Sequence, residues 1–411
     1  MGMNTSRRRF LRTTAAVAAT GAMIPSAHAA DPVRIGVITD LSGPSSGDTG
    51  MAAVYAAQFA VQDFGPKVLG RDIEVVVADD QGKPDVGLSI VRQWLDQQGV
   101  ATVIGNTISS EGIGIKRLCE DRKRPFLVGT SASSVFTQEE CSPFTVVFGV
   151  NTYSMPKGVV AALLAKGLDT WFFITADYAF GHTLEADSSA FVRNNGGKIV
   201  GSVRSPQATA DYSSFLLQAQ ASGAKVIGLA VQGFDFENLV KQAREFGFGQ
   251  PGRQTLAGLF VLENQVAGAG LDNAGGMVAS GAFYWDMNDA TRAYARRLMA
   301  RTGGVPPNGV QVAPYSAALH FLRGVQAAGT TDGAEVVAAM KRLPIDDFWS
   351  KGVQVREDGQ ALRPMYLFRI KTPAESRSKY DLYTTEGEVP SGQAWRPLAE
   401  SVCPFIRKGL R

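Results

Sequence analysis

Short apolar runs alternate along most of the chain with segments whose apolar residues recur at helical spacing. The short runs predict buried β-strands, and the recurring pattern predicts helices that pack one face against a sheet. Strands that alternate with helices through short connections form parallel sheets with helices on both faces. Up to residue 150 the pattern predicts strands over 33–38, 73–78, 101–104, 125–128 and 145–150, helices over 51–64 and 84–98, and a further helix that opens near 109.

The same alternation restarts after residue 150, which predicts a second lobe similar to the first. Near the end, 352–356 and 365–370 flank the turn Glu357-Asp358-Gly359 and predict a hairpin. The tail from Pro373 is polar and rich in proline, and we expect it to be irregular. The second series predicts strands over 171–175, 199–203 and 226–230 and helices over 184–194, 215–222, 236–246, 291–302, 312–328 and 335–343. Residues 275–283 carry the chain onward into Tyr284-Trp285-Asp286.

Two turns rich in hydroxyl groups follow neighbouring predicted strands. In the first, Gly105 ends an apolar run, and Asn106-Thr107-Ile108-Ser109-Ser110 leads into a helix. If Ser109 or Ser110 caps this helix, free backbone N–H groups and the positive end of the helix dipole face the carboxyl end of the strand. Parallel α/β sheets bind small anions there, although most serines at helix starts are only caps. The second turn, Gly129-Thr130-Ser131-Ala132-Ser133-Ser134, has the same position after its own strand.

The composition describes an ordinary globular protein, with 45% hydrophobic and 19% charged residues among 411. A chain of this length is expected to form two or three domains. The formal net charge is +3, but residues 1–30 hold four arginines and no acid, which leaves −1 for the remainder. A near-neutral body lacks the electrostatic footprint of a nucleic-acid-binding protein.

The first thirty residues have the features of an export signal. Ser6-Arg7-Arg8-Arg9-Phe10-Leu11-Arg12 is a twin-arginine-type motif, an apolar run follows over 13–24, and Ala27-His28-Ala29 supplies a cleavage site. The apolar run is about half the length that spans a bilayer, so a membrane-anchored helix is the less favoured alternative. We expect residues 1–29 to be removed and the mature periplasmic protein to start near Ala30.

The chain has three cysteines, and an exported compartment is oxidising. Cys119 lies in the apolar pattern of the helix that opens near 109 and is expected to be a core thiol. Cys141 and Cys403 lie in loop-like segments, where a disulfide forms more easily. We predict a Cys141–Cys403 disulfide that holds the C-terminal tail, while the spacing leaves Cys119–Cys141 open.

Motifs for catalysis and cofactor binding are missing from the sequence. Beyond the predicted signal only His182 and His320 remain, and neither has a cysteine or a second histidine at zinc-ligand spacing. The turn Gly129-Thr130-Ser131-Ala132-Ser133 lacks the final glycine of a nucleophile elbow, and no G-x-G-x-x-G or Walker A motif is present. We interpret Asp79-Asp80 as strand-end and turn residues. The expected protein is not an enzyme and uses no cofactor or metal.

Four segments share their order and spacing with one known family: Arg34-Ile35-Gly36-Val37 with Asp40-Leu41-Ser42-Gly43-Pro44, Ala176-Asp177-Tyr178-Ala179-Phe180-Gly181, Asp211-Tyr212-Ser213-Ser214-Phe215, and Pro364-Met365-Tyr366-Leu367-Phe368. In them the chain resembles the type I periplasmic solute-binding proteins, and among these the branched-chain amino acid (Leu/Ile/Val) receptors of ABC importers. The resemblance covers essentially the whole mature chain.

The resemblance implies an α/β fold of two Rossmann-like lobes with parallel sheets, joined by three crossover strands and closing on a ligand between them. The crossings are expected near 150–152, 283–286 and 343–348. Lobe 1 then comprises 30–150 and 285–345, lobe 2 comprises 151–284 and 346–385, and residues 386–411 form a C-terminal tail.

The resemblance also assigns ligand-binding positions. The family's contacts to a ligand carboxylate fall on Ser109 in the first hydroxyl turn, near Asn106, and on Ser131 and Ser133 in the second. Tyr178 matches the lobe 2 tyrosine that closes over the ligand. Asp235 matches the acid that accepts the ligand's α-ammonium group, and capping of the helix that begins at Phe236 is an equal alternative for it.

The first loop, Ser45-Ser46-Gly47-Asp48, departs from the family because it lacks the bulky aromatic residue of the amino-acid receptors. Phe234, Tyr284 and Trp285 bring aromatic side chains near the expected cleft instead, although core packing is their commoner use. This leaves room for a larger or flatter ligand, since some members of the family take up aromatic carboxylates. Glu263 and Asn264 are weaker candidates for the cleft.

The resemblance therefore implies a monomeric periplasmic receptor that captures a small carboxylate-bearing solute, with an amino acid as the first choice. Hinge closure would trap the solute, and the closed form would dock on an ABC permease in the inner membrane. The alternatives are a receptor for an aromatic carboxylate or a short amide, and a ligand sensor that reports to a signalling partner.

Overall fold

The computed structural model describes residue 1 and residues 31–409, so the predicted export signal lies outside the described residues. The first sheet has six strands in the order β2-β3-β1-β4-β5-β6. All neighbours in it are parallel except the short β2, which is antiparallel to β3. Its strands are β1 (Val33–Thr39), β2 (Lys67–Val68), β3 (Arg71–Asp79), β4 (Val100–Asn106), β5 (Phe126–Val128) and β6 (Thr145–Val147).

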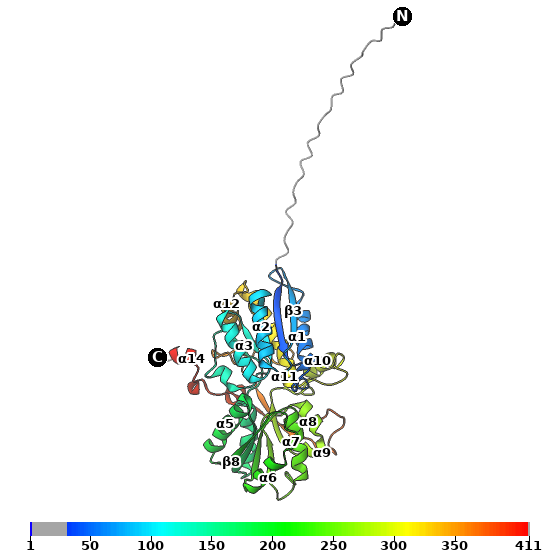
Figure 1. Ribbon diagram of the computed structural model, residues 1–411, viewed down its shortest axis with the longest axis vertical. Helices are drawn as coiled ribbons and strands as arrows, with labels where there is room; N and C mark the ends of the chain where they lie inside the picture. Colours follow the sequence, from blue (N-terminus) through cyan, green and yellow to red (C-terminus); the bar gives the residue numbers. More distant parts are fainter. Residues whose placement is uncertain (2–30, 410–411) are drawn as a thin grey trace. The chain divides into compact units, whose positions relative to one another are not determined.

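Helices cover both faces of this sheet (Figure 1). Alternation along β1 explains the two layers, because Ile35 and Val37 pack with residues of α1 and α11, whereas Ile38 packs with Trp94 of α2 and Ile115 of α3. The helices on or beside this sheet are α1 (Gly50–Phe64), α2 (Pro84–Gln97), α3 (Ser109–Asp121), α10 (Asp289–Met299), α11 (Gly309–Ala328) and α12 (Gly333–Arg342).

The second sheet has four parallel strands in the order β10-β9-β7-β8. In β7, Phe172 and Ile174 pack on one face and Trp171 and Phe173 on the other. Its strands are β7 (Thr170–Ala176), β8 (Lys198–Ser205), β9 (Val226–Ala230) and β10 (Thr255–Gly258), and its helices are α4 (Ser154–Ala165), α5 (Ala179–Asn194), α6 (Ser213–Ala221), α7 (Phe234–Glu245), α8 (Glu263–Ala269) and α9 (Leu271–Ala274).

The chain crosses three times from the layers around one large sheet to the layers around the other. The crossings follow β6, β11 and α12. A third, antiparallel sheet completes the fold in the order β11-β12-β13, with β11 (Val278–Gly281), β12 (Met365–Ile370) and β13 (Tyr383–Val389). The predicted α/β architecture with two parallel sheets is confirmed.

The predicted hairpin over 352–356 and 365–370 is wrong. Val353 and Val355 make only isolated bridges, to Ile345 and Ala361, and both valines are buried in the core that contains α11 and α12. β12 pairs instead with β11 and β13. The apolar residues of 352–356 are thus explained by burial, and the β13 partner lies in the tail that was expected to be irregular.

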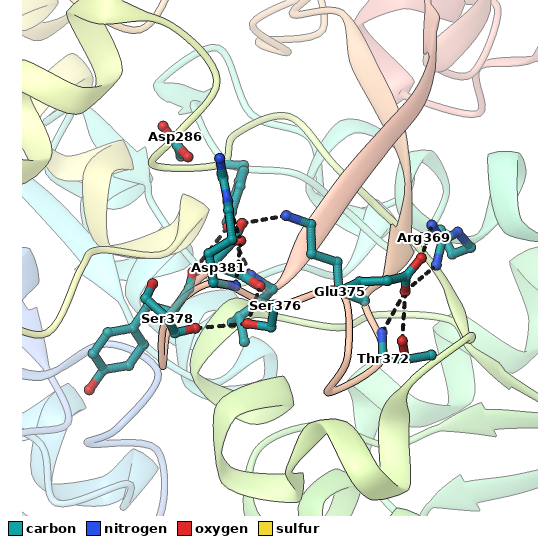
Figure 2. Close-up of polar contacts among 12 residues, drawn as sticks. Asp286, Arg369, Thr372, Glu375, Ser376, Ser378 and Asp381 are labelled. Carbon is teal, nitrogen blue, oxygen red and sulfur yellow. Dashed lines mark hydrogen bonds and ion pairs between the residues drawn. The ribbon is translucent and has the colours of Figure 1, made fainter.

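The connection between β12 and β13 is irregular but held by charges (Figure 2). The buried carboxylate of Asp381 accepts hydrogen bonds from the backbone N–H and Nε of Arg377, each at 3.0 Å, and pairs with Lys371. Glu375 pairs with Arg369 and accepts the backbone N–H of Thr372. Hydrogen bonds from Arg369 and then from Thr372 lower the pKa of Glu375 to about 2.

The C-terminal segment is tied to the first sheet's layer by the Cys141–Cys403 disulfide, while Cys119 is a buried free thiol. Within residues 31–409 no helix is both long and apolar enough to cross a membrane. The remaining short helices are α13 (Ser391–Ala394), α14 (Pro404–Gly409) and the 3₁₀ turns η1 (Ser134–Thr137) and η2 (Leu398–Glu400).

We predict that Cys403→Ser lowers the free energy of unfolding by about 2–4 kcal/mol, because the disulfide joins residues 262 positions apart and constrains the unfolded chain. Urea unfolding followed by circular dichroism measures the loss. A reductant should destabilise the native chain by a similar amount and leave the Cys403→Ser variant unchanged. An unaltered unfolding midpoint in reduced native protein would contradict the prediction.

Candidate functional site

Two adjoining cavities of about 430 Å³ and about 550 Å³ lie where strands of both large sheets end. Parallel α/β sheets bind ligands at the carboxyl ends of their strands. The cavities share Ser45, Asp48, Gly82, Ile108 and Gln232. The first is also lined by Asp40, Thr49, Asp80, Asn106, Thr107, Ser109, Thr130, Ala132, Phe180 and Leu262, and the second by Pro44, Tyr178, Gln207, Ala208, Gly233, Phe234 and Asp235.

The turn after β4 reaches the first cavity with Asn106 and Ser109. α3 begins at Ser109, and its cap residue is the extended Ile108, with no side-chain capping bond. The expectation that Ser109 or Ser110 caps this helix is therefore wrong, because the cap position falls one residue earlier, on an apolar residue. Because no side-chain cap accepts a hydrogen bond from the first-turn N–H groups of α3, these N–H groups can donate to an anion.

The second hydroxyl turn packs against the first and lines the first cavity with Thr130 and Ala132, but Ser131 and Ser133 do not line either cavity. The Ser131 hydroxyl donates to the carbonyl oxygen of Thr107 at 3.0 Å. The Ser133 hydroxyl donates to Thr183 Oγ1 at 3.1 Å, and its backbone N–H donates to Ser109 Oγ at 3.3 Å. Of the three serines predicted to hold a carboxylate, the structure places only Ser109 at the cavity, while Ser131 and Ser133 support it from behind.

The second sheet contributes Tyr178, Gln232 and Phe234 to the second cavity. The Tyr178 hydroxyl accepts a hydrogen bond from Gln232 Nε2 at 2.9 Å, and its ring stacks on Phe180 with centroids 5.8 Å apart. Phe234 is half exposed at the cavity rim. These placements are compatible with the predicted roles of Tyr178 and Phe234 in enclosing a ligand.

Asp235 lines the second cavity and is buried. Its carboxylate accepts hydrogen bonds from the backbone N–H groups of Ala208 (3.1 Å) and Thr209 (2.9 Å) and from the Tyr212 hydroxyl (3.0 Å). Burial raises its pKa, and these three donors oppose the rise. α7 begins at Phe234 with Gly233 as its cap residue and no side-chain cap, so the capping alternative for Asp235 is wrong. A carboxylate has about four acceptor positions, which leaves room for one more donor.

Tyr284 and Trp285 do not line either cavity. The Tyr284 hydroxyl and Trp285 Nε1 both donate to the carbonyl oxygen of Tyr380, at 3.0 and 3.1 Å. Leu382 N–H donates back to the Tyr284 hydroxyl at 3.0 Å. The two aromatic residues thus hold the connection between β12 and β13, which is the core-packing alternative to their predicted ligand role.

Asp48 links the two sides of the cleft and was missed as a site residue by the sequence analysis. It precedes α1 on the first sheet's side, and it accepts hydrogen bonds from Asn264 Nδ2 at 2.6 Å and Gln265 Nε2 at 3.1 Å, both on α8. Asn308, which caps α11, donates to the carbonyl oxygen of Asp48 and to Asn264 Oδ1. Burial raises the pKa of Asp48, and the bonds from Asn264 and then Gln265 lower it.

The cavity walls are acidic. Their lining residues include Asp40, Asp48, Asp80 and Asp235, and none of the lining residues is lysine, arginine or histidine. Two buried acceptors of the first cavity, Asp80 Oδ2 and Asn106 Oδ1, find no hydrogen-bond donor within the described part of the chain. Because buried polar groups are normally paired, the walls call for a ligand that donates hydrogen bonds or carries positive charge.

The fold and the position of these cavities define a class of protein. Residues 32–377 match the family described as periplasmic binding protein, and the chain belongs to this family. The family resemblance inferred from the sequence is confirmed. The family consists of periplasmic solute-binding proteins.

Solved structures of similar proteins have the same fold as this chain over most of its length. A periplasmic binding protein from Burkholderia mallei has a TM-score of 0.88 and 39% identity, covering 91% of this chain and 99% of its own. A branched-chain amino acid ABC transporter periplasmic ligand-binding protein from Burkholderia xenovorans LB400 has a TM-score of 0.82 and 38% identity, covering 91% and 100%. A solute-binding protein from R. palustris in complex with 4-hydroxybenzoate shares the fold, with a TM-score of 0.78 and 21% identity over 89% and 99%.

Among curated relatives, the Leu/Ile/Val-binding protein homolog 6 of Brucella abortus (strain 2308) is 27% identical over 203 residues. This match covers 49% of the present chain and 51% of the relative. The chain thus spans about half the length of this curated relative.

We predict that Asp48→Asn opens the cleft in the absence of ligand. The substitution places an amide donor opposite the donating amides of Asn264 and Gln265, and an unsatisfied buried polar group costs about 1–3 kcal/mol. Small-angle X-ray scattering should show a larger radius of gyration. Asp72→Asn is the control, because Asp72 makes an exposed ion pair with Lys67 on β2. Equal radii for native protein and both variants would contradict a role of Asp48 in closure.

Proposed function

We propose that the protein is the periplasmic receptor of an ABC importer and captures an amino acid in the cavities between the two large sheets. The observation that carries this proposal is that the same cavities offer hydrogen-bond donors to a carboxylate and acceptors to an ammonium group. The uncapped N-terminus of α3, with Ser109, offers N–H donors to a carboxylate. The aspartates that line the same cavities offer acceptors to an ammonium group.

A zwitterion satisfies both kinds of site, whereas a simple carboxylate satisfies only the first. An anion without an amine would face Asp40, Asp48, Asp80 and Asp235 with no basic residue among the lining side chains. We assign the ammonium group to Asp235, because its carboxylate retains acceptor capacity beside Tyr178. The similarity to proteins named as branched-chain amino acid and Leu/Ile/Val-binding proteins supports the same ligand class.

Closure of the two sides around the ligand is the proposed mechanism. Bonds that join residues of the two sides include Asp48 with Asn264, Ser133 with Thr183, and Ser134 with Asp187. A ligand that bridges Ser109 and Asp235 would add its own contacts to this set and shift the population toward the closed form. The closed form would then be the one that an ABC permease in the inner membrane recognises.

An aromatic carboxylate is the second candidate ligand. Phe180, Tyr178 and Phe234 give the cavities aromatic walls, and a flat ring stacks well on such side chains. The absence of a bulky aromatic in the loop 45–48 leaves room for it. Its weakness is the acidic lining, which repels an unpaired carboxylate.

We expect amino acids to raise the melting temperature of the purified protein more than aromatic acids do. A ligand at 100 times its Kd adds about 2.7 kcal/mol to the free energy of unfolding, which a thermal-shift screen detects. The screen should contain amino acids, amine-free aromatic acids and short neutral amides. Stabilisation by neutral amides alone would contradict the role of the α3 N-terminus as a carboxylate site.

Asp235→Asn should weaken amino-acid binding at least tenfold, because a hydrogen bond between charged groups contributes about 1.5–3 kcal/mol. Isothermal titration calorimetry measures the change. Asp272→Asn, on an exposed position of α9, is the matched control. If the ligand has no amine, the affinity of the Asp235→Asn variant should hold or rise, and this result would favour the aromatic acid. A circular dichroism melt of the variant verifies that it is folded.

A further inference from the structure

The C-terminal segment 391–406, which we call the C-terminal strap, contacts the layers around both large sheets. On the side of the second sheet, Trp395 is buried and belongs to the same apolar cluster as residues of α4, α5 and β7. The side chain of Lys157, on α4, donates a hydrogen bond to the carbonyl oxygen of Gln393. The first half of the strap is therefore part of the packing around the second sheet.

Arg396 adds a charged anchor on the same side. Its Nη2 pairs with the carboxylate of Asp187 on α5 at 2.5 Å, and its guanidinium lies over the ring of Tyr153, 4.4 Å from the centroid. Asp187 is buried and also accepts hydrogen bonds from the hydroxyl groups of Ser134 and Thr152, each at 2.8 Å. Ser134 belongs to the side of the first sheet, and Thr152 belongs to the first crossing. The strap thus meets the second side at the point where the chain passes from one side to the other.

The end of the strap is fixed on the side of the first sheet. Cys403 forms the disulfide with Cys141, which lies in the connection between η1 and β6. The backbone N–H of Val402 donates to Gln138 Oε1 at 3.1 Å, and Ile406 is buried in one cluster with the disulfide. Both cysteines are buried, and the bond is stable in an oxidising compartment. This anchor is therefore covalent.

A closed circuit of bonds results, and it spans the boundary between the two sides. Cys141 lies seven residues after Ser134, and Cys403 lies seven residues after Arg396. A stretch of this length reaches at most about 25 Å when fully extended, and a 3₁₀ turn shortens each of the two stretches. The hydrogen bond from Ser134 to Asp187 can break when the two sides separate, whereas the strap stays attached to both.

We propose that the C-terminal strap limits how far the two sides of the cleft separate in the solute-free protein. This inference rests on the hinge closure proposed above, because it concerns the range of that motion. A limited opening keeps the residues of both sides near the geometry that binds a solute, and such preorganisation reduces the cost of binding. The strap thus raises the affinity for a solute without touching it, since none of residues 391–406 lines either cavity.

The test measures the separation of the two sides by double electron–electron resonance in the absence of any solute. Spin labels are attached at Gln93→Cys on α2 and Lys241→Cys on α7, both exposed positions, while the buried Cys119 and the disulfide do not react. The decisive variant carries a Gly-Ser-Gly-Ser-Gly-Ser insertion after Ala399, which lengthens the strap and leaves both anchors in place. We expect its distance distribution to shift to longer values than that of the labelled native chain.

The same insertion between Gly303 and Gly304, in the exposed turn after α10, is the matched control and should leave the distribution unchanged. Cys141→Ser together with Cys403→Ser removes the covalent anchor and should lengthen the distances as the strap insertion does. An unchanged distribution after the strap insertion would overturn the proposal, even if the cysteine variant opens, because lost stability then explains that opening. Lengthening after the insertion but not in the cysteine variant would overturn the role of the disulfide as the anchor.

Failure of this inference and failure of the proposed function can be told apart. The distances are measured without a solute, so they do not depend on the outcome of the thermal-shift screen. If a solute that stabilises the protein in that screen shortens the distance in the native chain, while the strap insertion leaves the solute-free distance unchanged, the closure stands and the strap is refuted. Circular dichroism verifies that each labelled variant is folded.

Discussion

The contact between the two sides of the cleft depends on a buried carboxylate of one side that accepts hydrogen bonds from amides of the other. Asp48 belongs to the loop before α1, and its partners Asn264 and Gln265 belong to α8. A buried carboxylate is stable only while its donors are in place, so separation of the two sides must return Asp48 to water or leave it unpaired. In the closure that we propose, this contact is a two-state element, because Asp48 is satisfied by amides when the two sides meet and by solvent when they separate.

Most of the fold could be predicted because hydrophobic periodicity reports burial directly. β1, β4 and β7 are buried along nearly their whole length, as strands of parallel sheets covered on both faces are, and their apolar runs are visible in the sequence. The prediction of a hairpin strand over 352–356 was wrong for the same reason. Val353 and Val355 are buried by helices rather than paired in a ladder, and an apolar run does not distinguish these two outcomes.

The candidate site could be predicted only in part. The end of a strand is visible in the local sequence, whereas the direction of a side chain depends on contacts with distant parts of the chain. The turn at Asn106–Ser109 was found since a strand, a polar turn and a helix follow one another in sequence. Which serines face the cavity depends on packing between turns, and Ser131 and Ser133 are occupied by Thr107 and Thr183. Tyr284 and Trp285 were placed near the cleft by sequence, but the carbonyl group of Tyr380 takes both of their donors.

The group of acidic residues at the cavity wall could not be predicted from the sequence, for a related reason. Asp40, Asp79–Asp80 and Glu111 are about 30 to 40 residues apart in the chain, and each follows its own strand as a common turn or first-turn residue. Only the parallel register of β3, β1 and β4 brings their carboxylates together. The same wall bears on the ligand, because Asp40 and Asp80 present negative charge to the cavity that Ser109 also lines. A carboxylate at Ser109 meets less repulsion when the same ligand carries a positive group, so the acidic wall and the anion-binding turn together favour a zwitterion.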